Sequence, residues 1–363
     1  ANVCLSGADE LEGQAERWAY FFEAGCSSWF EAIKAHTFRS TFIDLHSQEA
    51  SVIVEHWERR RQICAASDAE GRQVEEAKLC SIFEEAASAL EPLRLRLHAA
   101  ARLGAGLLFV VCFFLAVVSN REAVQTESAA SSAGLAFVKL STRSPKDSRV
   151  ALAKAKAAYE ARLASMSPAA AGLLDDNERW KILSEEVTVA GAVPSGTQGL
   201  ELLLTSERVW EDLEFALRGP DGLLKSVSNS YQMSIAARAW DPRVTLRSEF
   251  RGIAWNGRLT CLCQYFHPLF FPELLELKAT IEADCCEKFS HPEVTAAVES
   301  LGGHCIIDFA WLGKGEVVIV ELNPFDGSLS YELGFGVVAV VVVVVASCCT
   351  NTHVPKYDTA KHN

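Results

Sequence analysis

The sequence predicts an α+β protein in which antiparallel hairpins are combined with amphipathic helices. Two pairs of strand-like segments, over residues 248–265 and 305–323, are each joined by a short glycine-containing turn, Asn-Gly in the first and Lys-Gly in the second. Asn-Gly between alternating segments is a strong hairpin signal. Residues 207–217 place apolar side chains three or four positions apart, which is typical of a helix with one buried face.

The composition indicates a folded protein with an acidic surface. The chain has 363 residues, 49% of them hydrophobic, which is enough for a substantial core. Its 34 basic and 47 acidic side chains give a net charge of −13, which repels nucleic-acid phosphates and anionic lipid, so we expect neither as a partner. The 12 cysteines include no Cys-x-x-Cys pair and indicate reduced thiols in a cytoplasmic protein. The first residue is Ala1, which is typical of a fragment or a processed chain.

The first third of the chain predicts a helix, strand and helix cap over residues 1–63, with the strand at 40–45, and a charged helical insert over 64–128. Residues 103–118 are an unbroken apolar run, shorter than the about 18–20 residues that cross a bilayer as a helix. We favour a buried helix over a membrane anchor for this run. A second run, residues 337–346, is nearly pure valine and favours a strand.

A lysine among apolar neighbours marks the next strand, residues 137–140. Lys139 is followed by a hydroxyl-rich basic loop that contains Ser141 and Arg143. Such a segment can bind phosphates, with Lys139 as a point charge and Arg143 as a planar fork. The simpler account is a lysine that reaches solvent beside a polar turn, and the local pattern alone favours it.

The middle of the chain contains no complete nucleotide motif. Residues 151–199 predict a helix and an irregular connection, in which 191–197 resembles a phosphate loop but lacks its lysine. The three leucines at 202–204 predict a short strand. The hydroxyl residues at 205 and 206 then predict the cap of the helix over 207–217.

The hairpin over residues 248–265 places an arginine on the same face as a glutamate. Pairing across its Asn-Gly turn sets Arg251 opposite Leu262 and Glu249 opposite Gln264. Arg251 then either forms an ion pair with Glu249 along the strand or binds phosphate while Glu249 orients it. The spacing does not separate these two readings.

The hairpin over residues 305–323 brings two acids together. Pairing about its Lys-Gly turn sets Asp308 directly opposite Glu321, with Cβ atoms about 5 Å apart, and alternation places Asn323 on the face of Glu321. Facing like charges need a shared proton or a bound cation, and an all-oxygen set suits Mg²⁺. The alternative is a solvated face, which the apolar neighbours disfavour. We expect Asp308→Asn to lower the affinity for a Mg²⁺-bound nucleotide, and to leave folding intact or to stabilise the protein when no nucleotide is bound.

Taken together, these segments resemble the cell division cycle protein 123 family, a branch of the ATP-grasp superfamily. The resemblance covers about residues 130–330, and the usual Asn-Trp of the family is replaced by Ser141-Thr142. The matching stretches are residues 137–147, Glu249-Phe250-Arg251, Gln264-Tyr265, Ile307-Asp308 and Glu321-Leu322-Asn323-Pro324-Phe325.

The resemblance implies an ATP-grasp-like fold, in which two lobes with antiparallel sheets enclose a nucleotide cleft. It implies a smaller lobe over residues 129–235, a larger lobe with the metal site over 236–335, and an atypical tail over 336–363. The implied cofactors are ATP and Mg²⁺. The residues implied to bind them are Lys139, Ser141 and Arg143 from the smaller lobe, Arg251 from the larger lobe, Arg238 and Trp240 near the adenine, and Asp308, Glu321 and Asn323 at the metal.

The resemblance also implies a function. Members of the family are assembly chaperones for eukaryotic translation initiation factor two, act on its gamma subunit, and so support protein synthesis and cell-cycle entry. We therefore expect an ATP- and Mg²⁺-binding chaperone without an assigned catalytic residue. Two alternatives stay open: an ATP-grasp ligase that activates a carboxylate as an acyl phosphate, and a degenerate interaction protein that no longer binds nucleotide.

Overall fold

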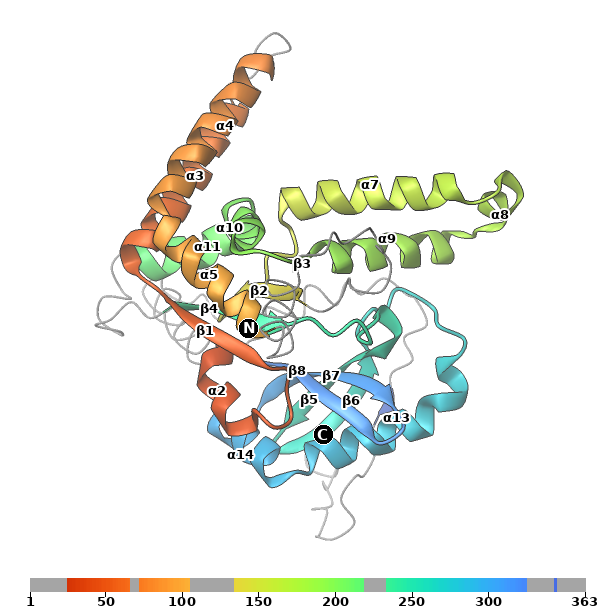
Figure 1. The fold of residues 1–363 in the computed structure, drawn as a ribbon. Coiled ribbons are helices and arrows are strands. Elements are labelled where there is room, and N and C mark those ends of the chain that lie inside the picture. The colour runs from red at the N-terminus through yellow and green to blue at the C-terminus, as the bar shows by residue number, and fades with distance from the viewer. Residues whose placement is uncertain (1–24, 66–71, 105–133, 219–232, 325–342, 345–363) are drawn as a thin grey trace, which may run out of the picture.

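The structure, a computed structural model, describes residues 25–65, 72–104, 134–218, 233–324 and 343–344 (Figure 1). Within these residues two antiparallel β-sheets lie one above the other, and each carries helices on its outer side. The predicted α+β class with two antiparallel sheets is confirmed. Residues 105–118, and all but 343–344 of the valine run 337–346, lie outside the described residues.

The first sheet has four strands in the order β1-β4-β2-β3. Its strands are β1 (Ser40–Leu45), β2 (Ala136–Leu140), β3 (Ala192–Val193) and β4 (Met233–Ala239). The strands predicted at 40–45 and 137–140 are confirmed. Because β1 pairs with β4 along its whole length, residues predicted as an N-terminal cap share a sheet with the predicted smaller lobe. The division into domains stays a prediction.

Helices cover the outer face of this sheet and form two arms. α3 and α4 run side by side away from the sheets, and α7 and α9, connected through α8, form the second arm (Figure 1). α5 and α10 pack close to the strands. The helices are α3 (Ser47–Ala65), α4 (Arg72–Ala89), α5 (Glu91–Gly104), α7 (Arg149–Ser165), α8 (Pro168–Leu173), α9 (Asp176–Ala190), α10 (Gly196–Leu204) and α11 (Glu207–Arg218).

Side chains that accept backbone hydrogen bonds fix where several of these helices begin. Ser148, Ser167, Asp175 and Ser195 cap α7, α8, α9 and α10 in this way. At α11 the hydroxyl of Ser206 accepts from the third backbone amide of the helix at 3.2 Å, which confirms the predicted cap.

The strand predicted at residues 202–204 is wrong, because these leucines end α10. Leu202, Leu203 and Leu204 are all buried, and a short apolar run that is buried on every side looks the same as a helix or as a strand. The pattern at residues 191–197 that resembles a phosphate loop has a packing role. A Cβ at Gly196 would come within 2.3 Å of the backbone oxygen of Arg94, so α10 and α5 touch through this glycine.

The second sheet has the order β8-β7-β5-β6-β9 and contains both predicted hairpins. The helices α2, α13 and α14 lie on its outer side (Figure 1). A short 3₁₀ helix, η1, precedes the strand β5. The elements are α2 (Cys26–Ile33), η1 (Leu246–Ser248), β5 (Glu249–Trp255), β6 (Arg258–Gln264), α13 (Leu274–Phe289), α14 (Pro292–Ser300), β7 (Cys305–Gly313), β8 (Glu316–Pro324) and β9 (Val343–Val344).

The register is as predicted in one hairpin and shifted in the other. Asp308 faces Glu321 across β7 and β8, as expected. Across β5 and β6, however, Arg251 faces Cys263 rather than Leu262. A β-bulge at Thr260 adds one residue to β6. The Thr260 hydroxyl donates to the backbone oxygen of Ile253 on β5 at 3.0 Å.

Neither arm nor any other helix of the described part of the chain combines the length and the apolar content needed to cross a membrane.

Candidate functional site

A cavity of about 320 Å³ lies between the two sheets and is lined by residues of both. This volume falls in the range of about 300–1,000 Å³ that is typical of small-ligand sites. The wall combines aromatic and charged side chains. Among its residues are Phe38, Phe137, Lys139, Lys146, Trp180, Leu183, Val187, Arg238, Trp240, Glu249, Tyr265, Asp308 and Glu321.

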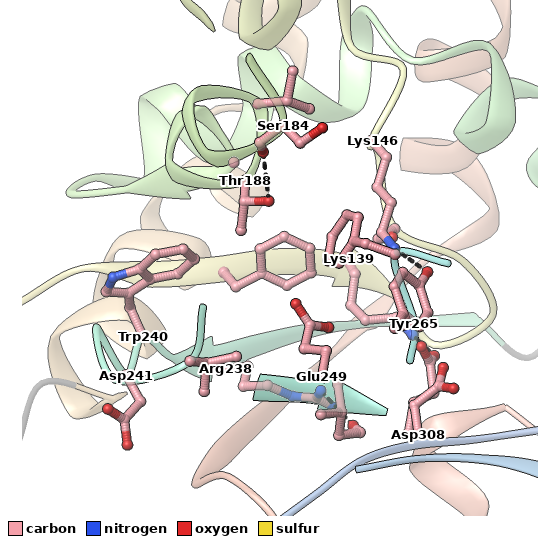
Figure 2. Close-up of a pocket in the computed structure, with 18 of the residues that line it drawn as sticks. Lys139, Lys146, Ser184, Thr188, Arg238, Trp240, Asp241, Glu249, Tyr265 and Asp308 are labelled. Carbon is pink, nitrogen blue, oxygen red and sulfur yellow. Dashed lines mark hydrogen bonds and ion pairs between the residues drawn. The ribbon is translucent and has the colours of Figure 1, made fainter. Parts of the chain in front are cut away.

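Charged and aromatic side chains lie on both sides of the cavity, with Arg238 and Asp241 near Trp240 and Tyr265 near Lys146 (Figure 2). In Figure 2, Trp240 lies on one side of the cavity, and Lys146, Tyr265 and Asp308 lie on the other. β4 ends just before Trp240, so the segment that connects the two sheets carries this indole. A wall that combines aromatic and charged side chains suits a ligand with a flat ring and an anionic tail.

Lys139 connects the two sheets through an ion pair. Its side chain is 2% exposed, and its Nζ donates to Oε1 of Glu321 on β8. Removal from bulk water opposes the ionisation of Glu321, but Lys139, with Arg238 and Lys146 farther away, outweighs it and lowers the pKa of the carboxyl group. The predicted strand lysine therefore does not reach solvent but faces the acid predicted at the metal.

Arg251 forms a two-pronged pair with Asp308. Its Nε and Nη2 donate to the two carboxylate oxygens at 2.8 and 2.9 Å, and its guanidinium lies 4.6 Å from the centre of the Tyr265 ring. The sequence analysis expected Glu249 either to form an ion pair with Arg251 or to orient it. Both expectations are wrong about the partner, which is Asp308. β5 and β7 are neighbours in the sheet, and their register sets Arg251 beside Asp308.

The three predicted metal ligands meet on one face of β7 and β8. Besides the facing pair Asp308 and Glu321, the Asn323 amide lies 3.4 Å from Oδ2 of Asp308. This all-oxygen set fits the chemistry of Mg²⁺. In the free protein the repulsion between the two acids is relieved by side-chain cations, Lys139 on Glu321 and Arg251 on Asp308. The role of the three residues as metal ligands stays a prediction.

Two residues of the basic loop after β2, Ser141 and Arg143, lie outside the cavity wall. Arg143 donates through Nε to Oδ1 of Asp212 at 2.8 Å and also contacts Glu211 at 3.0 Å, both on α11. Asp212 has a fully buried side chain, which needs such a cation. Neither Arg143 nor Ser141 lines the cavity, and the Ser141 carbonyl instead accepts the first amide of α2 at 2.7 Å. Their role in binding phosphate stays a prediction.

Arg238 lines the cavity and crosses from β4 to β8. Its Nη1 donates to the backbone oxygen of Val320 at 2.6 Å, while its buried Nε has no hydrogen-bond partner among the described residues. An unpaired buried donor is unfavourable, and the surrounding protein closes this N–H off. Arg238 and Trp240 thus lie at the wall, as predicted.

Sequence reasoning missed Lys146. Its Nζ donates to the Tyr265 hydroxyl at 2.7 Å. Desolvation alone would lower the pKa of Lys146, but Tyr265, Glu249 and Glu321 outweigh it and raise this pKa. The matched stretch 137–147 contains Lys146, so its position in the basic loop was the available signal.

Glu249 has a different role from the predicted one. Burial and the nearby Asp308 raise its pKa to about 7, although Lys146 and Arg251 oppose this shift. Glu249 therefore titrates near neutral pH in the cavity wall instead of orienting an arginine.

No protein-family model and no curated protein matches this chain. Among solved structures, the fold is similar to C-terminally truncated Cdc123 and to Cdc123, both from Schizosaccharomyces pombe. Each has 14% sequence identity and a TM-score of 0.44; the alignments cover 85% of this chain, and 86% of the truncated and 85% of the other Cdc123 chain. The solved structures thus come from the family that the motifs in residues 130–330 resemble.

Proposed function

We propose that the chain binds ATP with Mg²⁺ in the cavity between its sheets. One observation carries this proposal: Lys139, Asp308 and Glu321 from three separate strands converge at a cavity that aromatic side chains also line. A nucleotide combines a flat aromatic base with a phosphate tail, so both kinds of side chain find a match.

The ion pairs of the free protein indicate how such a ligand is accommodated. Lys139 exchanges Glu321 for phosphate oxygens, and this leaves Glu321, with Asp308 and Asn323, to hold the metal ion. Mg²⁺ supplies the charge that neutralises the phosphates. Trp240 stacks on the base, and Arg238 lines the same cavity. Each buried charge keeps an opposite charge throughout this exchange.

For the cellular role, we propose assembly of translation initiation factor two through its gamma subunit. The motifs over residues 137–147 and 321–325 support this role, because they resemble the family whose members perform it. Capture of purified gamma subunit by the purified chain tests the proposal. The absence of capture, with a folded chain and in the presence of ATP and Mg²⁺, would contradict it.

A second candidate function is that of an interaction protein that no longer binds nucleotide. The observation in its favour is that both acids of the proposed metal site already have a cation, Lys139 on Glu321 and Arg251 on Asp308. Such pairs are complete without a ligand. The same residues therefore have a purely structural explanation.

Titration calorimetry with ATP and Mg²⁺ separates the two candidates. We expect heat of binding for the unmodified chain, loss of that heat in Lys139→Met, and unchanged heat in Lys154→Met, which alters an exposed lysine on α7. Circular dichroism establishes that each variant is folded. If the folded, unmodified chain gives no heat with ATP and Mg²⁺, the proposal is overturned and the interaction protein is left.

A further inference from the structure

A second cluster of ligand-type side chains lies outside the cavity. We propose that His36, His291 and Glu293 bind a divalent transition metal ion, with Zn²⁺ as the best match to their chemistry. His36 follows α2 in the chain, His291 directly precedes α14, and Glu293 lies in the first turn of α14. One ligand atom from each lies within 4.8 Å of the other two, and none of the three lines the cavity between the sheets.

The donor set selects the class of metal. Two imidazoles and one carboxylate are the protein ligands of many open zinc sites, and they also suit other first-row transition metals better than Mg²⁺. With metal–ligand bonds of about 2.0–2.2 Å, ligand atoms of a tetrahedral site lie about 3.3–3.6 Å apart. His36 Nε2 and Glu293 Oε2 are 3.5 Å apart. Three protein ligands leave a fourth tetrahedral position for water.

The backbone holds both contributing segments in place. The His36 amide donates to the Ile33 oxygen and its carbonyl accepts from the Ile319 amide, each at 2.8 Å, so this loop is tied to α2 and to β8. The His291 carbonyl accepts two amides of α14 at 3.0 Å. Preorganised ligands lose little conformational freedom when they bind a metal.

The cluster is reachable and partly desolvated. The side chains of His36 and Glu293 are 11% and 58% exposed, so an ion can enter from solvent and then contact a mostly buried imidazole. The rings of His36 and His291 lie 4.7 Å apart between centroids. Both rings are therefore close enough to contact one ion.

The ammonium group of Lys288 acts against the ion. Its Nζ lies 3.5 Å from Nδ1 of His36, on the side of the ring away from the Nε2 that approaches Glu293. The ammonium must turn aside when Nδ1 carries the proton, and its charge repels a cation. Removing this charge in Lys288→Gln therefore strengthens metal binding, by about threefold to tenfold for a divalent ion about 6 Å away in water.

Cobalt provides a direct test, because its spectrum distinguishes ligand types. We expect the reduced full chain to bind one Co²⁺ with a visible ligand-field band and without the near-ultraviolet charge-transfer band of thiolate ligation, a necessary distinction in a chain with 12 cysteines. Zn²⁺ displaces the Co²⁺, whereas Mg²⁺ does not. His36→Gln and Glu293→Gln each weaken binding by at least about tenfold. The matched control His46→Gln, an exposed histidine before α3, leaves it unchanged.

The absence of the visible band, a thiolate band as the only signal, or equal affinities in Glu293→Gln and His46→Gln would overturn the proposal. Glu293 is exposed and its replacement leaves the core intact, so the test stands even if His36→Gln does not fold. ATP binding by Glu293→Gln reports on the cavity separately, because the two sites share no residue.

Discussion

The pair of Arg251 and Asp308 makes a quantitative prediction about stability. Their side chains are only 14% and 5% exposed, and Asp308→Asn removes the negative charge while leaving the guanidinium buried. Charges about 4 Å apart attract by about 4 kcal/mol at an effective dielectric constant of about 20, and removal of one member of a buried pair costs about 3–5 kcal/mol. Asparagine still accepts one hydrogen bond, so we expect a loss of about 3 kcal/mol.

This expectation reverses the one from sequence, in which Asp308→Asn relieves repulsion from Glu321. Because Lys139 already neutralises Glu321, little repulsion is left to relieve. Urea denaturation of the nucleotide-free chain, followed by circular dichroism, measures the change. The double variant Asp308→Asn/Arg251→Met should recover most of the lost stability, since it leaves no unpaired cation.

A surface pair provides the control for this measurement. Glu31→Gln disrupts a pair with Lys34 in which both side chains are more than half exposed, and we expect a change of no more than about 0.5 kcal/mol. Stability of Asp308→Asn equal to or above that of the unmodified chain would refute the reasoning, because repulsion between Asp308 and Glu321 would then dominate.

Three further predictions concern other residues of the two lobes. The pKa of Glu249 is raised from 4.5 to about 7, so the folded state holds its proton more tightly than the unfolded state, and this contribution to stability, complete below about pH 4.5, is lost as the pH rises to about 7. Glu249→Gln should therefore stabilise the chain relative to the unmodified protein more at pH 8 than at pH 5 in urea denaturation, and an equal effect at both would contradict the shift. Arg143→Met should destabilise the chain by about 3 kcal/mol through the buried Asp212 yet leave ATP affinity within about twofold in calorimetry. A large loss of affinity in folded protein would instead support the phosphate-binding role that the sequence predicts for Arg143. Trp240→Ala should weaken ATP binding by about 5- to 100-fold, the equivalent of about 1–3 kcal/mol for a stacked base, whereas unchanged affinity would place the base elsewhere.

Local sequence determined the hairpins. Asn256 and Gly257 adopt φ of 50° and 68°, the conformation that the Asn-Gly turn favours, and the facing of Asp308 and Glu321 followed from alternation and turn length. The acids, the amide and the strand lysine of the candidate site could therefore be named without coordinates. The three leucines at 202–204 could not be assigned, because burial on all sides removes the periodicity that separates a helix from a strand.

Only the tertiary structure decided which charges meet. Lys139 and Glu321 are 182 residues apart in the chain, and Arg251 and Asp308 are 57 apart. Their pairing depends on the order of strands in a sheet and on the approach of one sheet to the other, for which the local pattern contains no information. The sequence by itself thus determined the chemical groups of the site, whereas the fold determined that protein cations neutralise its acids, since Coulomb attraction depends on distance in space.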